Sequence, residues 1–500
     1  MHILGLLTAK ITKFRASPNH HLKFLNISFT CERLPSRCFF YTEKVAILPK
    51  IPRRICISYL KSLFLHGKSG NIAKNSAQNS NFMLIKRDFY LQQLIDGKQN
   101  GLIKIVTGIR RCGKSYLLFK LFKQHLLQSG VEFDHIIEIA LDDIENRTLR
   151  EPLALYHHIK QRIADKDLYY ILLDEVQLVP HFEEVLNSLL HLANADVYVT
   201  GSNSKFLSSD IVTEFRGRGD QIHLFPLSLA EFCEGTQQKP EDAWPDYYTF
   251  GGLPQVLSLK TDQKKLDYLS HLFESVYLKD IVERHRVKQT AELEELVRVM
   301  ASAIGAPLNP TKLENTFKSV KRVNIDSSTI NKYIGYMQDA FIVEKAVRYD
   351  VKGKKHIGSL AKYYFSDLGL RNAILGLRQQ EESHIMENII YNELRRRGCK
   401  VDVGMVSHRE VDANGKWMRK QLEVDFVVND GNRMCYIQSA LEMPDAEKRQ
   451  QETNSLMRIK DAFQKIIVVK GNIKPWRDEN GILTISLLQF LMDPNSHHLQ

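Results

Sequence analysis

The chain has 500 residues, 43% hydrophobic and 25% charged, an ordinary composition for a globular protein of roughly two to four domains. No stretch approaches the roughly 18 consecutive apolar residues of a membrane-spanning helix, so we expect no membrane association. The seven cysteines form no C-x-x-C pair, which excludes the common cysteine metal frameworks and predicts a reduced, cytoplasmic setting.

The net charge of +11 resides in the N-terminal segment, residues 1–82. This segment has 13 Lys and Arg residues but only two acids, Glu32 and Glu43, whereas the remainder has 56 of each sign. We predict a disordered extension that ends in a Gly-, Ser- and Asn-rich linker at 67–82. A nucleic-acid arm, an organelle-targeting peptide and translation from an upstream start codon all fit this composition. We favour the last, with Met83 as the true initiator.

Five apolar runs follow Met83 and alternate with helical stretches. Continuous Ile, Val and Leu runs are typical of strands buried on both faces, which form parallel sheets covered by helices. We therefore predict an α/β nucleotide-binding fold for residues 83–235. The third run is expected to neighbour the first in the sheet, as in ATPases of the additional-strand class. The runs occupy residues 102–107, 135–141, 169–174, 196–201 and 221–225.

The first run leads into the segment GIRRCGKS, which satisfies the phosphate-loop pattern G-x-x-x-x-G-K-[ST] and precedes an apolar helix. The glycines allow backbone N–H groups to surround a phosphate, and the helix N-terminus adds partial positive charge. Lys114 is expected to reach the β- and γ-phosphates, and the Ser115 hydroxyl to bind Mg²⁺. The pattern predicts ATP with Mg²⁺ as the ligand, bound by Gly108, Ile109, Arg110, Arg111, Cys112, Gly113, Lys114, Ser115 and Tyr116.

The third run ends in Asp174 and Glu175, a Walker B pattern after four hydrophobic residues. Asp174 is expected to hold Mg²⁺ through water. Glu175 is expected to orient and activate the hydrolytic water. The alternative is an exposed acidic turn after a core strand.

Two further candidates flank the fourth and fifth runs. In TGSNS, Asn203 or Ser202 is placed to sense the γ-phosphate, although either could instead cap the helix SKFLSSD. In EFRGRG, Arg216 or Arg218 could reach a γ-phosphate in a neighbouring subunit, which would raise the rate roughly 10³- to 10⁵-fold and require a homo-oligomer. We take Arg218 as the catalytic candidate; the alternative is a surface arginine paired with an acid.

Residues 236–290 are predicted to form a helical, lid-like segment. Residues 291–370 follow the order helix, helix, helix, hairpin, which predicts a winged helix-turn-helix. Ile330, Ile334 and Met337 share one face of the third helix, and its start can be capped by Asp326 or Ser327.

The winged helix carries polar and basic residues that could meet nucleic-acid phosphates. Asn331 and Lys332 lie on the expected exposed face of its third helix. The wing adds Lys352, Lys354 and Lys355. A charged hairpin is usually only solvated, and the balanced charge of the main body weakens the case for DNA binding.

A series of motifs occurs in a single order from Met83 to the C-terminus. The motifs are TGIRRCGKSYLL, YYILLDEVQLV, TGSNSKFLSSDIVTEFRGRG, FPLSLAEF, FGGLP, YLKDIVERH, KYYFSDLGLRNA, ENIIYNELRRRG, LEVDFVV and YIQSA. They resemble prokaryotic AAA-type ATP-binding proteins with a C-terminal domain of unknown function. The resemblance implies an ATPase core, a winged-helix segment and a terminal domain of restriction-endonuclease-type fold, here residues 371–500.

Nucleases of that fold hold a metal with an Asp and a Glu, and use a Lys two residues after the Glu to activate water. Glu387 can supply the helix carboxylate and Asp425 the strand carboxylate. The E-x-K position holds Gln438, Ser439 and Ala440, so a ligand and the basic residue are absent. We therefore predict an inactive domain, unless Glu423 or Lys448 takes the missing place.

These features predict a Mg²⁺-dependent ATPase of the AAA type that couples its nucleotide state to its C-terminal domains, engaging a nucleic-acid or protein partner. The rival hypothesis is a nucleotide-gated binding module with little turnover. An ATP-regulated nuclease is a third possibility, which Gln438 and Ala440 disfavour.

Overall fold

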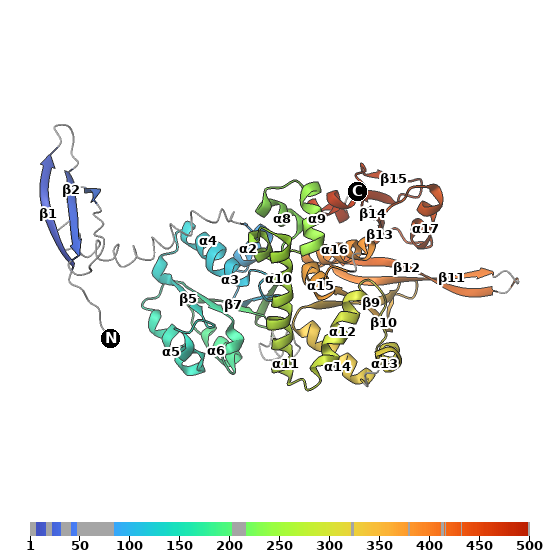
Figure 1. Cartoon of the computed structure of the whole chain (residues 1–500), viewed down its shortest axis with the longest axis horizontal. Helices are drawn as coiled ribbons and strands as arrows, with labels where there is room; N and C mark the ends of the chain where they lie inside the picture. The colour runs from blue at the N-terminus through green and yellow to red at the C-terminus, as the bar shows by residue number, and fades with distance from the viewer. Residues whose placement is uncertain are drawn as a thin grey trace. The chain divides into compact units, whose positions relative to one another are not determined.

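The computed structural model divides the chain into two compact units, Met1–Asn81 and Phe82–Gln500 (Figure 1). The described residues are 7–16, 23–31, 42–47 and 85–498, with gaps at 203–216, 322–324, 379–380, 412–414, 416 and 432.

The first unit contains a three-stranded antiparallel sheet in the order β1-β2-β3. The prediction of a disordered extension did not anticipate these strands. It rested on charge and composition, whereas LTAKITKF and KFLNISFT also alternate apolar and polar residues, which is a strand pattern. The strands are β1 (Leu7–Ala16), β2 (Lys23–Cys31) and β3 (Thr42–Ile47).

The second unit begins with a five-stranded parallel sheet in the order β5-β6-β7-β4-β8. The predicted α/β sheet is confirmed. The expected contact between the first and third strands is wrong, because β7 pairs with both β4 and β6 and separates them. The strands are β4 (Ile103–Thr107), β5 (Ile136–Ala140), β6 (Tyr169–Asp174), β7 (Ala195–Gly201) and β8 (Gly219–His223).

Helices cover both faces of this sheet. Successive side chains of a strand point to opposite faces, so Ile105 packs with one helical layer and Val106 with the other. The layer against Ile105 contains α5 (Pro152–Arg162) and α6 (Phe182–Leu189). The layer against Val106 contains α2 (Asp88–Asp96) and the helix after the loop, which comprises α3 (Lys114–Tyr116), η1 (Leu117–Phe122) and α4 (Lys123–Gln128). Short turns of helix complete the connections: η2 (Phe133–His135), η3 (Arg147–Arg150) and η4 (Val176–Leu178).

A helical segment follows the sheet. Its first helix starts at a capping box, in which the Glu231 backbone N–H donates to Ser228 Oγ over 3.2 Å and the Ser228 N–H donates back to Glu231 Oε2 over 2.9 Å. Figure 1 shows α10, η7 and α11 running on from one another as a long rod through the middle of the unit. The elements are α8 (Leu229–Thr236), α9 (Pro240–Phe250), η6 (Pro254–Ser258), α10 (Asp262–Leu272), η7 (Phe273–Leu278) and α11 (Lys279–His285).

Three helices and a hairpin come next, in the order that the sequence predicted. Asp326 caps the third helix by accepting the Thr329 N–H over 2.9 Å, and the predicted apolar face of this helix is buried. The elements are α12 (Thr290–Ser302), α13 (Pro310–Thr316), η8 (Phe317–Lys321), α14 (Ser327–Asp339), β9 (Val343–Asp350) and β10 (Lys355–Phe365).

This hairpin is not a separate wing. It joins an eight-stranded mixed sheet in the order β10-β9-β11-β12-β13-β14-β16-β15, in which β9 runs parallel to β11. The predicted boundary at residue 370 therefore lies between strands of one sheet, and the winged helix stays a prediction. The other strands are β11 (Lys400–Val411), β12 (Trp417–Asp430), β13 (Arg433–Ala440), β14 (Gln464–Val469), β15 (Trp476–Arg477) and β16 (Leu483–Ser486).

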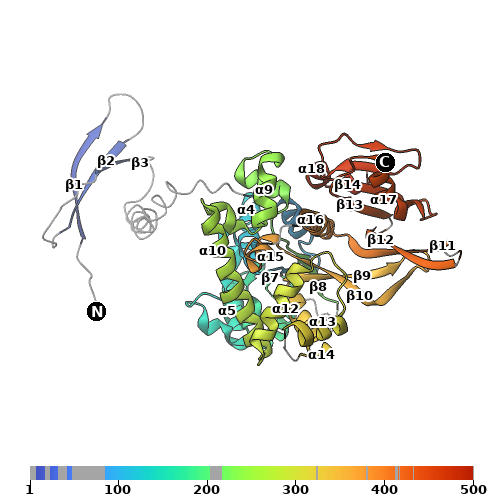
Figure 2. The ribbon, with the colours of Figure 1, turned by 45° about the vertical axis from the view of Figure 1, so that its right-hand side comes forward.

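Helices pack on this mixed sheet, and two of its strands extend past it. β11 and β12 remain paired out to Val411 opposite Trp417, and Figure 2 shows them projecting beyond their neighbours as a two-stranded ribbon. The helices are α15 (Leu368–Ile374), α16 (Glu382–Arg396), α17 (Ala446–Met457), α18 (Leu487–Met492) and η9 (Ser496–His498).

Two motifs that lie more than a hundred residues apart lock α9 to α15. Asp367 accepts the Gly252 N–H over 2.8 Å and the Leu370 N–H over 3.0 Å, and burial raises the pKa of Asp367 to about 6. Gly251 has φ +75°, and a Cβ there would lie 2.4 Å from Asp367 Oδ1. FGGLP and KYYFSDLGLRNA thus form one buried joint, which explains the glycine at this position.

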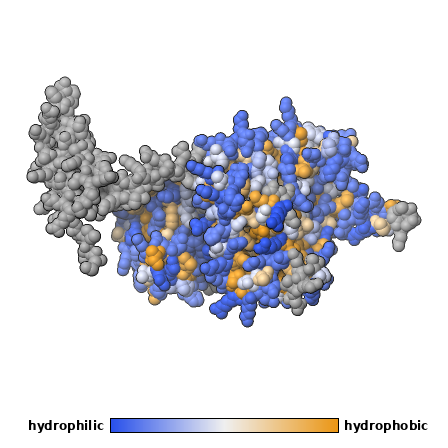
Figure 3. Space-filling view, viewed as in Figure 1, coloured by the Kyte–Doolittle hydropathy of each residue, from blue (hydrophilic) through white to orange (hydrophobic). Residues whose placement is uncertain are grey.

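Within the described part of the chain, no helix has both the length and the apolar character needed to cross a bilayer. On the face shown in Figure 3, apolar patches are interspersed with hydrophilic side chains.

Candidate functional site

The loop after β4 has the backbone that the phosphate-loop pattern requires. Gly108 has φ +145°, and a Cβ there would lie 2.2 Å from the carbonyl oxygen of Leu224. Gly113 has φ +103° and stands immediately before the helix that starts at Lys114. No L-residue with a side chain fits the first position, so the glycines set the shape of the loop.

Lys114 folds back into this loop. Its Nζ donates to the carbonyl oxygens of Gly108 over 3.1 Å and of Ile109 over 3.3 Å, and the side chain is buried. These carbonyls are neutral, and no carboxylate of the described residues forms an ion pair with this buried ammonium. An anion in the loop would supply the missing charge.

The two predicted magnesium residues meet between the loop and β6. Ser115 Oγ donates to Asp174 Oδ2 over 2.7 Å, and Thr200 Oγ1 donates to Asp174 Oδ1. Burial raises the pKa of Asp174, and the hydroxyl donors oppose this rise. A hydroxyl and a carboxylate in contact are hard oxygen ligands of the kind that Mg²⁺ prefers, so these residues fit the ion.

Glu175 has a strained backbone and a fixed side chain. Its φ is +54°, which is rare for a residue with a side chain, and its N–H donates to Thr200 Oγ1 over 3.0 Å. Ser202 Oγ donates to Glu175 Oε1 over 2.6 Å, and Gln177 Nε2 donates to the other carboxylate oxygen. Ser202, one of the two sensor candidates, is therefore brought to Glu175.

The remaining loop residues divide into buried and outward-facing groups. Ile109 and Cys112 are buried under the loop, and burial raises the pKa of the Cys112 thiol. These two can offer only backbone groups to a ligand. Arg111 has φ +65°, and Tyr116 is half-buried on the helix.

Arg110 connects the loop to the helical rod, a contact that the sequence did not predict. Its Nη2 lies 2.8 Å from Asp280 Oδ1, and Asp280 also pairs with Arg284. The Tyr277 hydroxyl donates to the Arg110 carbonyl over 2.6 Å. Both partners of Arg110 lie in the motif YLKDIVERH, which was the available signal.

A second unpredicted chain of contacts runs from β4 toward the mixed sheet. Thr107 Oγ1, one residue before the loop, lies 3.1 Å from His223 Nδ1. His223 Nε2 lies 3.9 Å from Glu344 Oε1 in β9, and Arg395 Nε donates to Glu344 Oε2 over 2.7 Å. Burial lowers the pKa of His223 to about 4, so the imidazole is neutral near pH 7. No local pattern in the sequence predicts these pairs.

Of the other sensor and arginine candidates, only Arg218 lies among the described residues. Asn203 and Arg216 lie outside the described residues. Arg218 is exposed, and its carbonyl accepts the Ile103 N–H over 2.8 Å. That contact places Arg218 at the start of β4, whereas the loop follows its end, about 16 Å away for five residues in a strand.

The predicted nuclease residues Glu387 and Asp425 lie in a cluster of charged residues at the mixed sheet. Lys362 Nζ lies 2.8 Å from Glu387 Oε1 and 2.6 Å from Glu423 Oε1. The Ser439 N–H donates to Asp425 Oδ2 over 2.8 Å. Burial is the largest cause that raises the pKa of Asp425, and Lys362 opposes it. Lys362 of β10, which the sequence did not predict, therefore occupies the space between the carboxylates.

The remaining C-terminal candidates are scattered. Gln438 Oε1 accepts the Asp425 N–H over 3.4 Å, so Gln438 adjoins the cluster. Lys448 pairs instead with Glu452 on α17 over 2.8 Å. Asn331 and Lys332 are exposed on α14, and the hairpin lysines are also exposed. Nothing beyond exposure supports the nucleic-acid surface.

The parallel sheet and its phosphate loop define a P-loop nucleotide-binding protein. A family model described as an AAA domain matches residues 100–233, and a domain of unknown function (DUF8612) matches residues 241–381. The chain belongs to the AAA-type ATP-binding proteins that carry a separate C-terminal domain of unknown function.

Its relatives extend over most of the chain. An uncharacterized protein of Haemophilus influenzae is 32% identical over 415 residues, 82% of this chain and 99% of the relative. An uncharacterized protein of Methanocaldococcus jannaschii is 27% identical over 412 residues, 79% of this chain and 86% of the relative. Among solved structures, a Walker-type ATPase of Pyrococcus abyssi matches 59% of this chain and 97% of its own, with 13% identity and a TM-score of 0.43.

Proposed function

We propose that the chain is a Mg²⁺-dependent ATPase whose nucleotide state is coupled to its C-terminal region. The observation that carries this proposal is the contact between Ser115 and Asp174, 2.7 Å long, next to the buried Lys114. A hydroxyl and a carboxylate from two distant segments meet at the start of one helix, and the ammonium of its first residue is held at the carbonyls of the same loop. An anion with a bound divalent cation needs this set of groups.

Each residue has a distinct task in this proposal. Lys114 and the loop N–H groups bind the phosphates, and Ser115 and Asp174 hold Mg²⁺, Asp174 through water. When bound, Mg²⁺ neutralises charge that develops on the phosphates. The other phosphate-loop residues, from Gly108 to Tyr116, position the nucleotide through backbone groups and the helix N-terminus.

Glu175 acts as the residue that orients the attacking water and accepts its proton. Ser202 and Gln177 each donate to one carboxylate oxygen, which holds the group in a single orientation. A fixed carboxylate lowers the entropy lost on reaching the transition state. The positive φ of Glu175 adds about 1–3 kcal/mol of strain, which the local contacts sustain.

The nucleotide state would be coupled to the C-terminal region through two series of contacts that begin at the phosphate loop. The ion pair of Arg110 with Asp280 links the loop to α11. At the end of α11, the ring of His285 stacks on that of Tyr336 in α14, with 3.7 Å between the ring centroids. The chain through Thr107, His223 and Glu344 links the loop to β9. A change of charge or shape in the loop would therefore bias both α14 and the mixed sheet.

Assembly and partners belong to the same proposal. Asn203 would sense the γ-phosphate, and Arg218, far from the loop of its own chain, would act on a neighbouring subunit of a homo-oligomer. The exposed lysines of α14 and the hairpin would contact nucleic acid. Size-exclusion chromatography with light scattering, with and without ATP, tests the assembly.

Phosphate release tests the activity and separates it from the rival switch. Wild-type protein with Mg²⁺ and ATP should release phosphate, Lys114→Ala should not, and Glu175→Gln should retain ATP without releasing phosphate. Wild-type protein that binds ATP but releases phosphate no faster than Glu175→Gln is a nucleotide-gated switch. Nuclease activity stays disfavoured, because Lys362 occupies the carboxylate cluster, and a plasmid-nicking assay with Mg²⁺ or Mn²⁺ checks it.

A further inference from the structure

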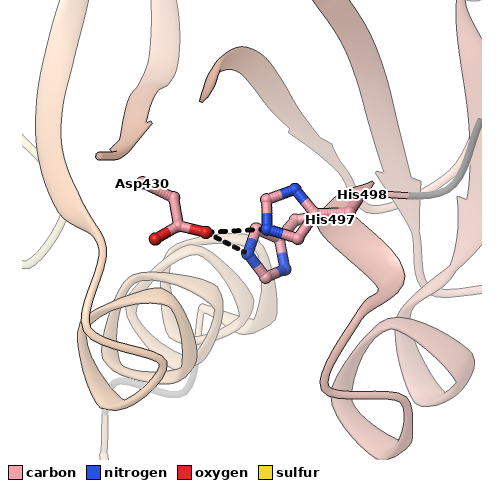
Figure 4. A group of neighbouring side chains, drawn as sticks. All are labelled: Asp430, His497 and His498. Carbon is pink, nitrogen blue, oxygen red and sulfur yellow. Dashed lines mark hydrogen bonds and ion pairs between the residues drawn. The ribbon is translucent and has the colours of Figure 1, made fainter. Parts of the chain in front are cut away.

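Two histidines near the C-terminus point at one carboxylate oxygen. His498 Nε2 lies 2.7 Å from Asp430 Oδ2, and His497 Nε2 lies 3.9 Å from the same atom. Figure 4 shows both rings directing this nitrogen toward the carboxylate at the end of β12. The candidate ligand atoms of the three residues all lie within 4.8 Å of one another.

We propose that Asp430, His497 and His498 form a binding site for a divalent transition-metal ion of the zinc class. Imidazole nitrogens and one carboxylate oxygen are a common zinc ligand set. Tetrahedral ligands bound at their usual lengths lie about 3.3–3.7 Å from one another. The nitrogen–oxygen distances of 2.7 and 3.9 Å bracket this range, so small movements of the partly exposed Asp430 and His498 side chains would bring the three atoms to it.

The position of the three residues favours a site with an open coordination position. They line a cavity of about 270 Å³ together with Arg433, Phe463 and others. Three protein ligands beside a cavity leave room for a fourth ligand from solvent, as in zinc sites that bind water or a small molecule. His497 is buried, which fixes its ring, whereas the other two ligands remain accessible to an arriving ion.

Arg397 is the main opposing group, because metal binding would cost it one hydrogen bond, while its other acceptors stay in place. Its Nη1 lies 3.1 Å from His497 Nδ1, and a metal on Nε2 would require that Nδ1 carry the proton. Nη1 keeps Ser496 Oγ as an acceptor at 3.0 Å, and Nε pairs with Glu393 at 2.7 Å. Cys399 Sγ lies 3.7 Å from His497 Nε2 and stands next to the site.

Metal content tests the proposal on the full-length protein. The protein is stripped with a chelator, loaded with Zn²⁺, desalted and measured by elemental analysis, and Co²⁺ loading provides a visible spectrum. The variants are His498→Gln and Asp430→Asn, which change partly exposed side chains. The matched control is His135→Gln, from a second cluster with Asp165 and Asp167 that contains only one histidine.

Wild type and His135→Gln are expected to retain one more equivalent of zinc than either site variant. Replacing a residue that is hydrogen-bonded to a metal ligand lowers metal affinity by roughly 10- to 100-fold. Because the site variants replace ligands themselves, their zinc affinity should fall further. Zn²⁺ should raise the melting temperature of wild type and of His135→Gln only. Equal zinc content in all four proteins, or an unchanged Co²⁺ spectrum in both site variants, overturns the proposal; melting curves without metal verify folding.

Discussion

The two sheets of the larger unit place their buried charges differently. In the parallel sheet, Lys104 and Asp196 pair at the beginning of β4 and β7, and Asp174 stands at the end of β6. In the mixed sheet, Lys362 lies within β10 and is surrounded by carboxylates from α16 and β12. Near the strand ends, the buried Lys104 is matched by a single carboxylate, whereas Lys362 within its strand depends on several carboxylates from other elements.

The largest expected effect is on the stability of the mixed sheet. Lys362→Met would leave buried carboxylates without their cation and should lower the free energy of unfolding by about 3–5 kcal/mol. Lys104→Met should lower it by only about 1–3 kcal/mol, because Asp196 keeps the hydroxyl of Tyr198 and the N–H of Gln99 as donors. Urea denaturation of the two variants compares them.

A double variant identifies the cause of this loss. Adding Glu387→Gln to Lys362→Met removes one of the stranded charges and should recover part of the lost stability. A loss for Lys362→Met no larger than that for Lys104→Met would contradict the contrast between the sheets.

A pH effect is expected where the two sheets meet. The folded-state pKa of His223 is about 4, below the 6.5 of a free imidazole, so the unfolded chain takes up a proton first as the pH falls. Stability should therefore decrease between about pH 6.5 and pH 4, by up to about 3 kcal/mol from this group. His223→Gln removes this contribution.

Denaturant midpoints at about pH 7 and pH 4.5 measure the effect. The control is His181→Gln, which changes an exposed imidazole away from this junction. If His223→Gln and wild type showed the same pH dependence of stability, the lowered pKa of His223 would be contradicted.

A smaller effect is expected for the link between the loop and α11. Asp280→Asn breaks a partly exposed ion pair with Arg110, worth about 0.2–1 kcal/mol. Hydrogen exchange in α14 should slow on ATP binding in wild type and respond less in this variant. Glu283→Gln, on the same helix and paired with the exposed Lys279, is the control. An unchanged ATP response in Asp280→Asn would exclude coupling by this route.

The smallest effect is expected for an exposed lysine of the C-terminal region. Lys448 pairs with Glu452 on the surface of α17, so Lys448→Ala should change the free energy of unfolding by about 0.5 kcal/mol or less. Thermal melting compares it with Lys362→Met. A large loss would mean that Lys448 has a role in the charge cluster that its position does not indicate.

The features predicted from the sequence are those that depend on residues close together along the chain. The five strands and the phosphate loop follow from apolar runs and one motif, because strand burial and loop shape are set by consecutive side chains. Strand order was partly mispredicted, since nothing local specifies that β7 lies between β4 and β6. The pairing of Thr107 with His223 spans 116 positions and has no local signature either.

Two of the recognised motifs contain residues whose contacts could not be predicted from the sequence. YLKDIVERH holds Tyr277 and Asp280, which contact Arg110, and KYYFSDLGLRNA begins with Lys362 and contains Asp367. Their tasks depend on partners brought together only by folding. The strands of the N-terminal unit were not predicted, because charge and composition do not report the alternation of apolar and polar residues that specifies a strand.

Equilibrium binding of labelled ATP in the presence of Mg²⁺ tests the central claim most directly. Wild-type protein should show saturable binding, and Lys114→Ala should bind about 10- to 100-fold more weakly, because a hydrogen bond to a charged group contributes about 1.5–3 kcal/mol. Absence of saturable binding by wild-type protein, or equal binding by Lys114→Ala, would contradict the assignment of the loop as a nucleotide site.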